Sequence, residues 1–188
     1  MRKVLCYIYE GMADFEITFL LHRLRNTGKM EIISISEEDN AVTAQSGLSF
    51  VPMKKISEID ALEEIEALII PGGPIDNCQN SICPLVKKMI GKGKLVAAIC
   101  FGPQFLGRAD ILKDYKYTTS CSEEKIKKLG CDDPFFRPNY ISQRCVVDRN
   151  LITSQGYAFI DFAKEVCEYL QIFDNEKQEY EQIGRVKE

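Results

Sequence analysis

Short apolar runs alternate with amphipathic segments along most of this 188-residue chain, and this alternation constrains the fold most strongly. Several runs are apolar on both faces, as strands are when helices cover both sides of a parallel sheet. The pattern predicts an α/β domain of the flavodoxin-like, doubly wound kind, with a mostly parallel sheet. The expected strands span residues 4–9, 30–36, 67–70, 95–99 and 151–154. The expected helices span residues 16–26, 57–64, 81–91, 122–129 and 157–170, and residues 42–51 are predicted to form a hairpin at the sheet edge.

The length suits one domain, since domains usually run to about 100–200 residues. We assign residues 1–173 to this domain and residues 174–188 to a charged C-terminal tail. The net charge of −4 gives no electrostatic reason to expect nucleic acid as a partner. No apolar stretch approaches the roughly 20 residues of a membrane helix, so we expect no membrane partner. The first residues indicate a strand and not a signal peptide, which predicts a cytoplasmic protein whose eight cysteines are mostly thiols.

The spacing of the cysteines does not indicate a metal site. Four residues separate Cys78 from Cys83 and nine separate Cys121 from Cys131, whereas zinc sites typically have a gap of two. The single histidine, His22, is far from these pairs in the sequence and lies within a predicted helix. We therefore expect neither a metal nor a cofactor.

Cys100 occupies the position of a nucleophile elbow. It follows the apolar run 95–99, has small residues at Ala98 and Gly102, and precedes Pro103. In such an elbow a strand turns sharply into a helix, and the strained turn residue presents its side chain above the sheet. The helix N-terminus would favour a thiolate, so Cys100 is a candidate nucleophile or redox sensor.

Three turns are predicted to converge near Cys100, because ligands of open α/β sheets bind at the carboxyl ends of the strands. One turn precedes Glu16, a second is formed by residues 71–74 (PGGP), and the third is the elbow. Gly72 and Gly73 allow close backbone approach and could offer oxyanion-hole amides together with those that follow Cys100. The plainer alternative is an ordinary turn between a strand and a helix.

Glu16 is the candidate acidic group. Its carboxylate could simply complement a helix N-terminus. If it instead points at Cys100, burial would raise its pKa, and the protonated carboxyl could donate to a thiolate or an oxidised sulfur. Glu10 and Asp14 are rival carboxylates that we expect to be solvated.

Four segments together resemble the ThiJ/PfpI family, also called the DJ-1 family. They are residues 11–16 (GMADFE), 68–73 (LIIPGG), 97–103 (AAICFGP) and 151–156 (LITSQG). The resemblance runs from residue 3 to about residue 172 and implies a flavodoxin-like fold akin to the class I glutamine amidotransferase domain. It also implies that Cys100 is the nucleophile, that Glu16 is its acidic partner, that Gly73 and Phe101 supply oxyanion-hole amides, and that the protein forms a homodimer.

The chain departs from the family where a histidine would be expected. Peptidase-like members carry histidine directly after the cysteine, where this chain has Phe101, and glyoxalase- or deglycase-like members carry one where it has Ser120. A Cys–His dyad is therefore not expected, and peptide hydrolysis is the least expected activity because acyl transfer needs a base. By the same resemblance Cys121 would lie near Cys100, where it could trap a sulfenate as a disulfide. The alternative for Cys121 is an unrelated thiol.

Three functions remain open at this point. The first is an enzyme acting on small aldehydes or related small molecules, of glyoxalase, deglycase or hydrolase type. The second is a non-catalytic thiol sensor or protective protein in oxidative stress, whose partner is a small oxidant. The third is a dimeric scaffold that has lost its chemistry.

Overall fold

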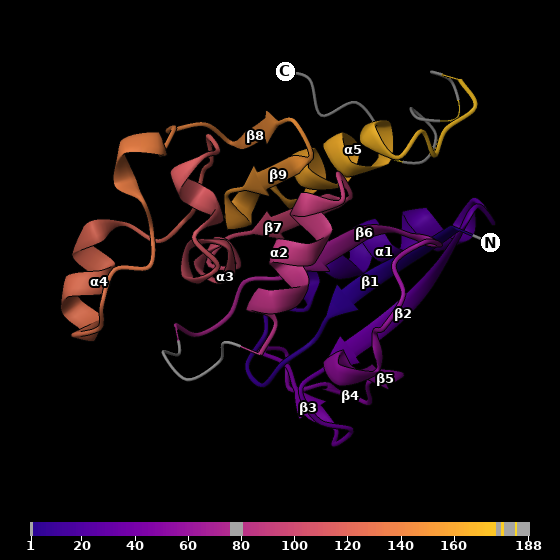
Figure 1. Cartoon of the computed structure of the whole chain (residues 1–188), viewed down its shortest axis with the longest axis horizontal. Helices are drawn as coiled ribbons and strands as arrows, with labels where there is room; N and C mark the ends of the chain where they lie inside the picture. Colours follow the sequence, from indigo (N-terminus) through magenta and orange to yellow (C-terminus); the bar gives the residue numbers. More distant parts are fainter. Residues whose placement is uncertain (1, 76–80, 176–177, 179–182, 184–188) are drawn as a thin grey trace.

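The computed structural model describes residues 2–75, 81–175, 178 and 183, and its centre is a seven-stranded sheet (Figure 1). The strand order is β5-β2-β1-β6-β7-β9-β8, and every neighbouring pair is parallel except β8–β9. The strands are β1 (Arg2–Tyr7), β2 (Met30–Ser36), β5 (Lys54–Lys55), β6 (Ile65–Ile70), β7 (Leu95–Ile99), β8 (Cys145–Asp148) and β9 (Leu151–Ser154). The mostly parallel α/β sheet predicted from the apolar runs is therefore confirmed.

The described residues form five α-helices. They are α1 (Phe15–Asn26), α2 (Cys83–Gly91), α3 (Pro103–Arg108), α4 (Glu123–Leu129) and α5 (Phe159–Tyr169). Helix α1 packs against α5 and helix α2 against α3, so the two pairs cover opposite faces (Figure 1). Because both faces are covered, the central strands are apolar throughout, and every residue of β7 is fully buried. Single-turn 3₁₀ helices lie at Ile56–Glu58, Ile111–Lys113, Arg137–Asn139 and Gly156–Ala158.

Two of the expected elements differ in the structure. Residues 57–64 were expected to form a helix, but only the 3₁₀ turn Ile56–Glu58 forms there. Residues 59–62 have no regular secondary structure, residues 63–64 form a turn, and the Glu64 carbonyl accepts the Lys3 amide at 2.9 Å directly before β6 begins. The expected hairpin exists as β3 (Val42–Thr43) and β4 (Ser49–Phe50), but it forms a separate two-stranded sheet instead of extending the large one.

The C-terminal tail and the lengths of the helices bear on two further expectations, the extent of the domain and contact with a membrane. Most of the predicted charged tail, residues 174–188, lies outside the described residues, so its boundary stays a prediction. Within the described part of the chain, no helix is long and apolar enough to cross a membrane.

Candidate active site

The turn between β7 and α3 has the geometry of a nucleophile elbow. Cys100 has φ +61°, a left-handed conformation that side-chain-bearing residues rarely adopt. The Gly102 amide donates to the Ile99 carbonyl at 2.8 Å and closes the turn. A Cβ at Gly102 would lie 2.7 Å from the Ile70 carbonyl oxygen, which explains why a glycine is needed there. The elbow holds the Cys100 side chain half-buried at the carboxyl end of the sheet.

Glu16 lies beside this sulfur and is almost fully buried, with 2% of its surface exposed. Its carboxyl hydrogen-bonds with the Cys100 thiol, and its Oε2 atom accepts the Gly72 amide at 2.8 Å. The first turn of α1 therefore brings a carboxyl group to the elbow instead of leaving it in solvent.

Two glycines form the walls around the carboxyl and the sulfur. A Cβ at Gly72 would lie 2.6 Å from Glu16 Oε2 and 2.7 Å from Cys100 Cβ. A Cβ at Gly156 would lie 2.8 Å from both Cys100 Sγ and Glu16 Oε1. Any larger residue at either position would displace the pair, so the slot accepts only glycine.

The amides of Gly72, Gly73 and Phe101 were all expected to form an oxyanion hole, but in the structure they have different partners. Gly72 donates to Glu16, so it holds the carboxyl group and does not serve as an oxyanion donor. The Phe101 amide hydrogen-bonds with the Cys100 sulfur. The Gly73 amide donates to no backbone carbonyl among the described residues, which is compatible with the oxyanion role expected for it.

Ser120 lies on the other side of the sulfur, in the place where the family resemblance puts a histidine. Its hydroxyl approaches Cys100, accepts the Gly156 amide at 2.8 Å and donates to Gln155 Oε1 at 3.0 Å. The Gln155 amide nitrogen in turn donates to Thr118 Oγ1 at 2.7 Å and to the Thr119 carbonyl at 2.9 Å, which fixes its orientation. Gln155 could not be singled out from the sequence, because its role depends on a contact with Ser120, 35 residues away.

Glu16 and Cys100 form a coupled pair of buried acids. Burial raises the pKa of the Glu16 carboxyl, although the hydrogen bonds from Cys100 and Gly72 oppose this. Burial, the Glu16 charge and the hydrogen bond to Glu16 raise the pKa of the Cys100 thiol to about 12, against the opposing Ser120 and Phe101 contacts. Because each charge opposes the other, ionisation of the thiol depends on which group holds the shared proton.

The raised pKa of Cys100 runs against the expectation that the helix N-terminus favours a thiolate there. Helix α3 has only six residues and begins with Pro103, so its dipole is short and Pro103 offers no amide hydrogen. Burial beside a carboxylate outweighs that contribution.

Other residues considered from the sequence lie away from the pair or in other roles. Cys121 is fully buried, and the groups that act on its thiol are Arg137, Asp133, Lys125 and Cys131. Its carbonyl accepts a hydrogen bond from Arg137 at 2.8 Å, and nothing joins its sulfur to Cys100. His22 is exposed on α1, and no hydrogen bond between it and Cys100 occurs among the described residues.

The two other candidate carboxylates, Glu10 and Asp14, differ in their exposure to solvent. Glu10 is exposed and accepts the Thr43 amide at 2.8 Å. Asp14 was expected to be solvated but is buried, and its Oδ2 accepts the Ser46 hydroxyl at 2.7 Å, because the β3–β4 hairpin folds over it. Among the described residues, no group of three or more His, Cys, Asp or Glu side chains could hold a metal.

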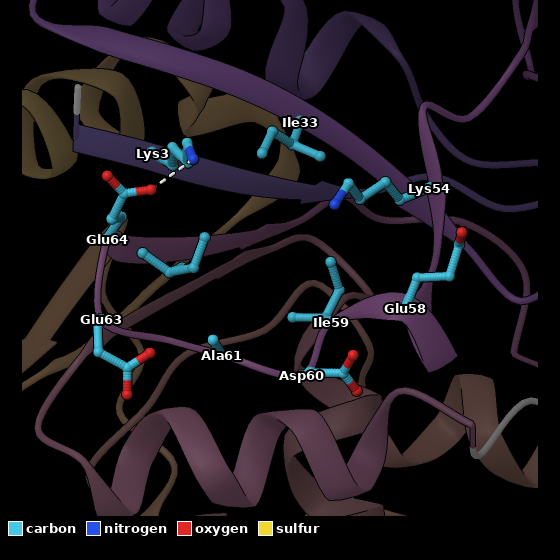
Figure 2. A pocket seen from close by; sticks show the side chains of 10 residues that line it. Lys3, Ile33, Lys54, Glu58, Ile59, Asp60, Ala61, Glu63 and Glu64 are labelled. Carbon is cyan, nitrogen blue, oxygen red and sulfur yellow. Dashed lines mark hydrogen bonds and ion pairs between the residues drawn. The ribbon is translucent and has the colours of Figure 1, made fainter.

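A hollow of about 410 Å³ lies elsewhere, at the amino ends of β1 and β6 (Figure 2). Lys3 and Ile65 line it from these strand starts, whereas Cys100 follows the last residue of β7. Lys54, Glu58 and Glu64 bring charges of both signs to its rim. The hollow is therefore distinct from the elbow and does not share its chemistry.

A cysteine on a strained elbow, at the carboxyl edge of a parallel sheet and against a buried carboxyl group, defines the class of α/β proteins with a nucleophile elbow. The family model described as the DJ-1/PfpI family matches residues 2–169. The chain belongs to the DJ-1/PfpI family.

Relatives of known name support this membership. A deglycase of Thermococcus kodakarensis is 31% identical over 157 residues, which cover 81% of this chain and 89% of the relative. A deglycase of Pyrococcus horikoshii is 32% identical over 157 residues, with the same coverage of 81% and 89%. Among solved structures, the DJ-1 superfamily protein Atu0886 from Agrobacterium tumefaciens has a TM-score of 0.82 and 26% identity, covering 97% of this chain and 96% of that one.

Proposed function

We propose that this protein is an enzyme that acts on small aldehydes, of glyoxalase or deglycase type, with Cys100 as nucleophile and Glu16 as its acid–base partner. The observation that carries the proposal is the hydrogen bond between a buried carboxyl group and a cysteine held on a strained elbow. The deglycase names of the relatives agree with this chemistry. Peptide hydrolysis fits less well, because the site offers no histidine to protonate an amine leaving group.

The first chemical step follows from the shared proton. The thiol proton moves to Glu16, and the thiolate sulfur attacks the carbonyl carbon of the aldehyde. The carbonyl π electrons move to oxygen, and the proton held by Glu16 is returned to that oxygen, which gives a neutral hemithioacetal. The Gly73 amide is the donor we assign to the developing oxyanion.

The test is turnover of methylglyoxal by the wild type and by Cys100→Ala. We expect Cys100→Ala to abolish turnover, because no other thiol shares the elbow or contacts Glu16 among the described residues. Cys131→Ala is the matched control, since it removes a half-buried thiol elsewhere and should keep activity within about twofold. Absence of turnover on a panel of small aldehydes would overturn the proposal.

A thiol sensor is the second candidate function, and the same carboxyl group favours it. A protonated Glu16 can donate a hydrogen bond to a sulfinate on Cys100, which stabilises that oxidation state. Mild hydrogen peroxide should therefore convert Cys100 selectively to sulfinate, two peroxide molecules being reduced to water. Mass spectrometry should show that Glu16→Gln changes the oxidation product, and uniform oxidation of all the cysteines would exclude a sensor.

We also propose that the protein forms a homodimer and works in the cytoplasm. Exposed aromatic rings near the site support the dimer, because Phe15 is 53% and Tyr157 is 66% exposed beside Glu16 and Gly156. Burying such rings against a second copy would remove apolar surface from water. Sedimentation velocity that shows only monomer at micromolar concentration would count against the dimer.

A further inference from the structure

Tyr9 is a buried residue next to the site to which neither the sequence nor the family resemblance assigns a role. Its hydroxyl donates to the Pro71 carbonyl at 3.1 Å. Its ring fills the space beside Gly73, where a Cβ would lie 2.5 Å from the hydroxyl oxygen. The ring stacks on Tyr7 at 5.0 Å and meets the edge of Phe105 at 5.4 Å, so it has little freedom to move.

The Pro71 carbonyl belongs to the same peptide unit as the Gly72 amide. In a trans peptide these two groups point in opposite directions. Tyr9 binds the oxygen end of the unit, and Glu16 Oε2 accepts its N–H end at 2.8 Å. The next carbonyl, that of Gly72, accepts the Ala13 amide at 2.8 Å. Tyr9 and Ala13 of the β1–α1 connection and Glu16 of α1 thus hold the Pro71–Gly72 turn at three points, with Tyr9 on the side opposite Glu16.

We propose that Tyr9 is a positioning residue: by holding the Pro71–Gly72 peptide, it aims the Gly72 amide at Glu16 and so determines whether Glu16 or Cys100 keeps their shared proton. The inference deepens the proposed function and rests on it. A tyrosine hydroxyl is suited to this role because it has one proton to donate, and burial keeps that proton on the phenolic oxygen.

The direction of the effect follows from the charges around the peptide. Tyr7 from β1, Glu16 from α1, Cys100 from the elbow and Arg108 from α3 face Tyr9, and burial raises the Tyr9 pKa well above its usual value. Tyr9 therefore stays neutral, and only Glu16 and Cys100 exchange a proton near neutral pH. The Gly72 amide favours the ionised carboxylate, so weakening that bond leaves the proton on Glu16. A neutral Glu16 no longer opposes the thiolate.

Removing the Tyr9 hydroxyl should accordingly make Cys100 more reactive. We expect Tyr9→Phe to increase the rate of iodoacetamide alkylation at Cys100 about three- to tenfold at pH 7, the range for a partly lost hydrogen bond to a charged group. The rate is measured from pH 5 to 10 by mass spectrometry of the Cys100 peptide, so the readout does not depend on turnover. Tyr7→Phe is the matched control, because it removes a hydroxyl from an equally buried ring that does not bond Pro71, and it should leave the profile unchanged.

A double-mutant comparison separates positioning from packing. In a Glu16→Gln background Tyr9→Phe should have no effect on the profile, because glutamine exchanges no proton with Cys100. An effect that persists in that background overturns the inference. A Tyr9→Phe profile equal to that of the wild type overturns it as well, while the proposed function stands if Glu16→Gln alone changes the profile. If Glu16→Gln leaves the profile unchanged, the proposed pair fails and the role of Tyr9 fails with it.

A second variant keeps the test decisive if Tyr9→Phe does not fold. Placing 3-fluorotyrosine at position 9 alone retains the ring and makes its hydroxyl a stronger donor. A more strongly polarised Pro71–Gly72 peptide binds the Glu16 carboxylate better. The alkylation rate at pH 7 must then fall below that of the wild type, and a rate that rises or stays the same overturns the inference.

Discussion

Gly156 shows how closely single residues constrain the reactive pair. Its missing side chain leaves room for both Cys100 Sγ and Glu16 Oε1, each of which would lie 2.8 Å from a Cβ at this position. We expect Gly156→Ala to push the sulfur and the carboxyl group apart, lowering alkylation of Cys100 at least about tenfold and the free energy of unfolding by about 1–3 kcal/mol. Alkylation kinetics and urea denaturation measure the two effects.

Gly91 provides the matched control for that substitution. It ends α2, and a Cβ there would meet nothing within 4 Å. Gly91→Ala should leave alkylation unchanged and raise the free energy of unfolding by about 0.5–1 kcal/mol, since alanine is the better helix former. Equal alkylation rates in Gly156→Ala and the wild type would show that the slot tolerates a methyl group.

At the same scale, the sequence predicted those residues whose role depends on local backbone chemistry. Cys100 could be identified because the elbow needs small neighbours within two positions, and Glu16 because it follows a strand end. The partners of these residues could not be identified in the same way. The Gly72 amide could serve either an oxyanion or Glu16, and only the packing of α1 decides for Glu16. Tyr9 reads as one more apolar residue after β1 until its hydroxyl is seen to reach Pro71, 62 residues away.

At the scale of elements, apolar periodicity predicted the buried strands well and the segments at the edge of the sheet poorly. Strand β7 is apolar at every position because both its faces are covered, so residues 95–99 were predicted with their correct bounds. Strand β8 was not predicted. It pairs antiparallel with β9 at the edge of the sheet, where Val146 is buried and Val147 is 48% exposed. An alternation of buried and exposed residues over only four positions is too short to recognise in the sequence.

One segment with a helical pattern, residues 57–64, does not form the expected helix. Residues 57–64 carry a good N-cap residue and an amphipathic pattern, yet only the 3₁₀ turn Ile56–Glu58 forms, and the chain reaches the sheet at Glu64, whose carbonyl accepts the Lys3 amide. By contrast, α4 begins at Glu123, one residue after its expected start, and ends at its expected residue Leu129, because its signals are local. The Ser122 hydroxyl accepts the Lys125 amide, and Gly130 ends the helix with φ +65°.

For the molecule as a whole, thiols with raised pKa values make the free energy of unfolding decrease at alkaline pH. Burial raises the pKa of Cys6 to about 12 and that of Cys145 to about 12, and the Cys100 thiol reaches about 12 with the added effect of Glu16. The ordinary pKa of a cysteine thiol is 9.0. These thiols therefore stabilise the fold fully below pH 9 and lose that contribution as the pH rises through 12, because the unfolded chain releases its protons first.

We accordingly expect the free energy of unfolding to fall steeply between pH 9 and 11, by up to about 1.4 kcal/mol per pH unit for each such thiol. Cys6 is the clearest position to test, since it is 1% exposed on the central strand β1 and its shift comes from burial alone. Urea denaturation under reducing conditions should give a shallower slope for Cys6→Ala than for the wild type. Cys6→Val changes the packing in the opposite sense but removes the same ionisation, so it must share the shallower slope. Slopes that follow side-chain volume, and not loss of the thiol, would show that packing and not proton release governs alkaline unfolding.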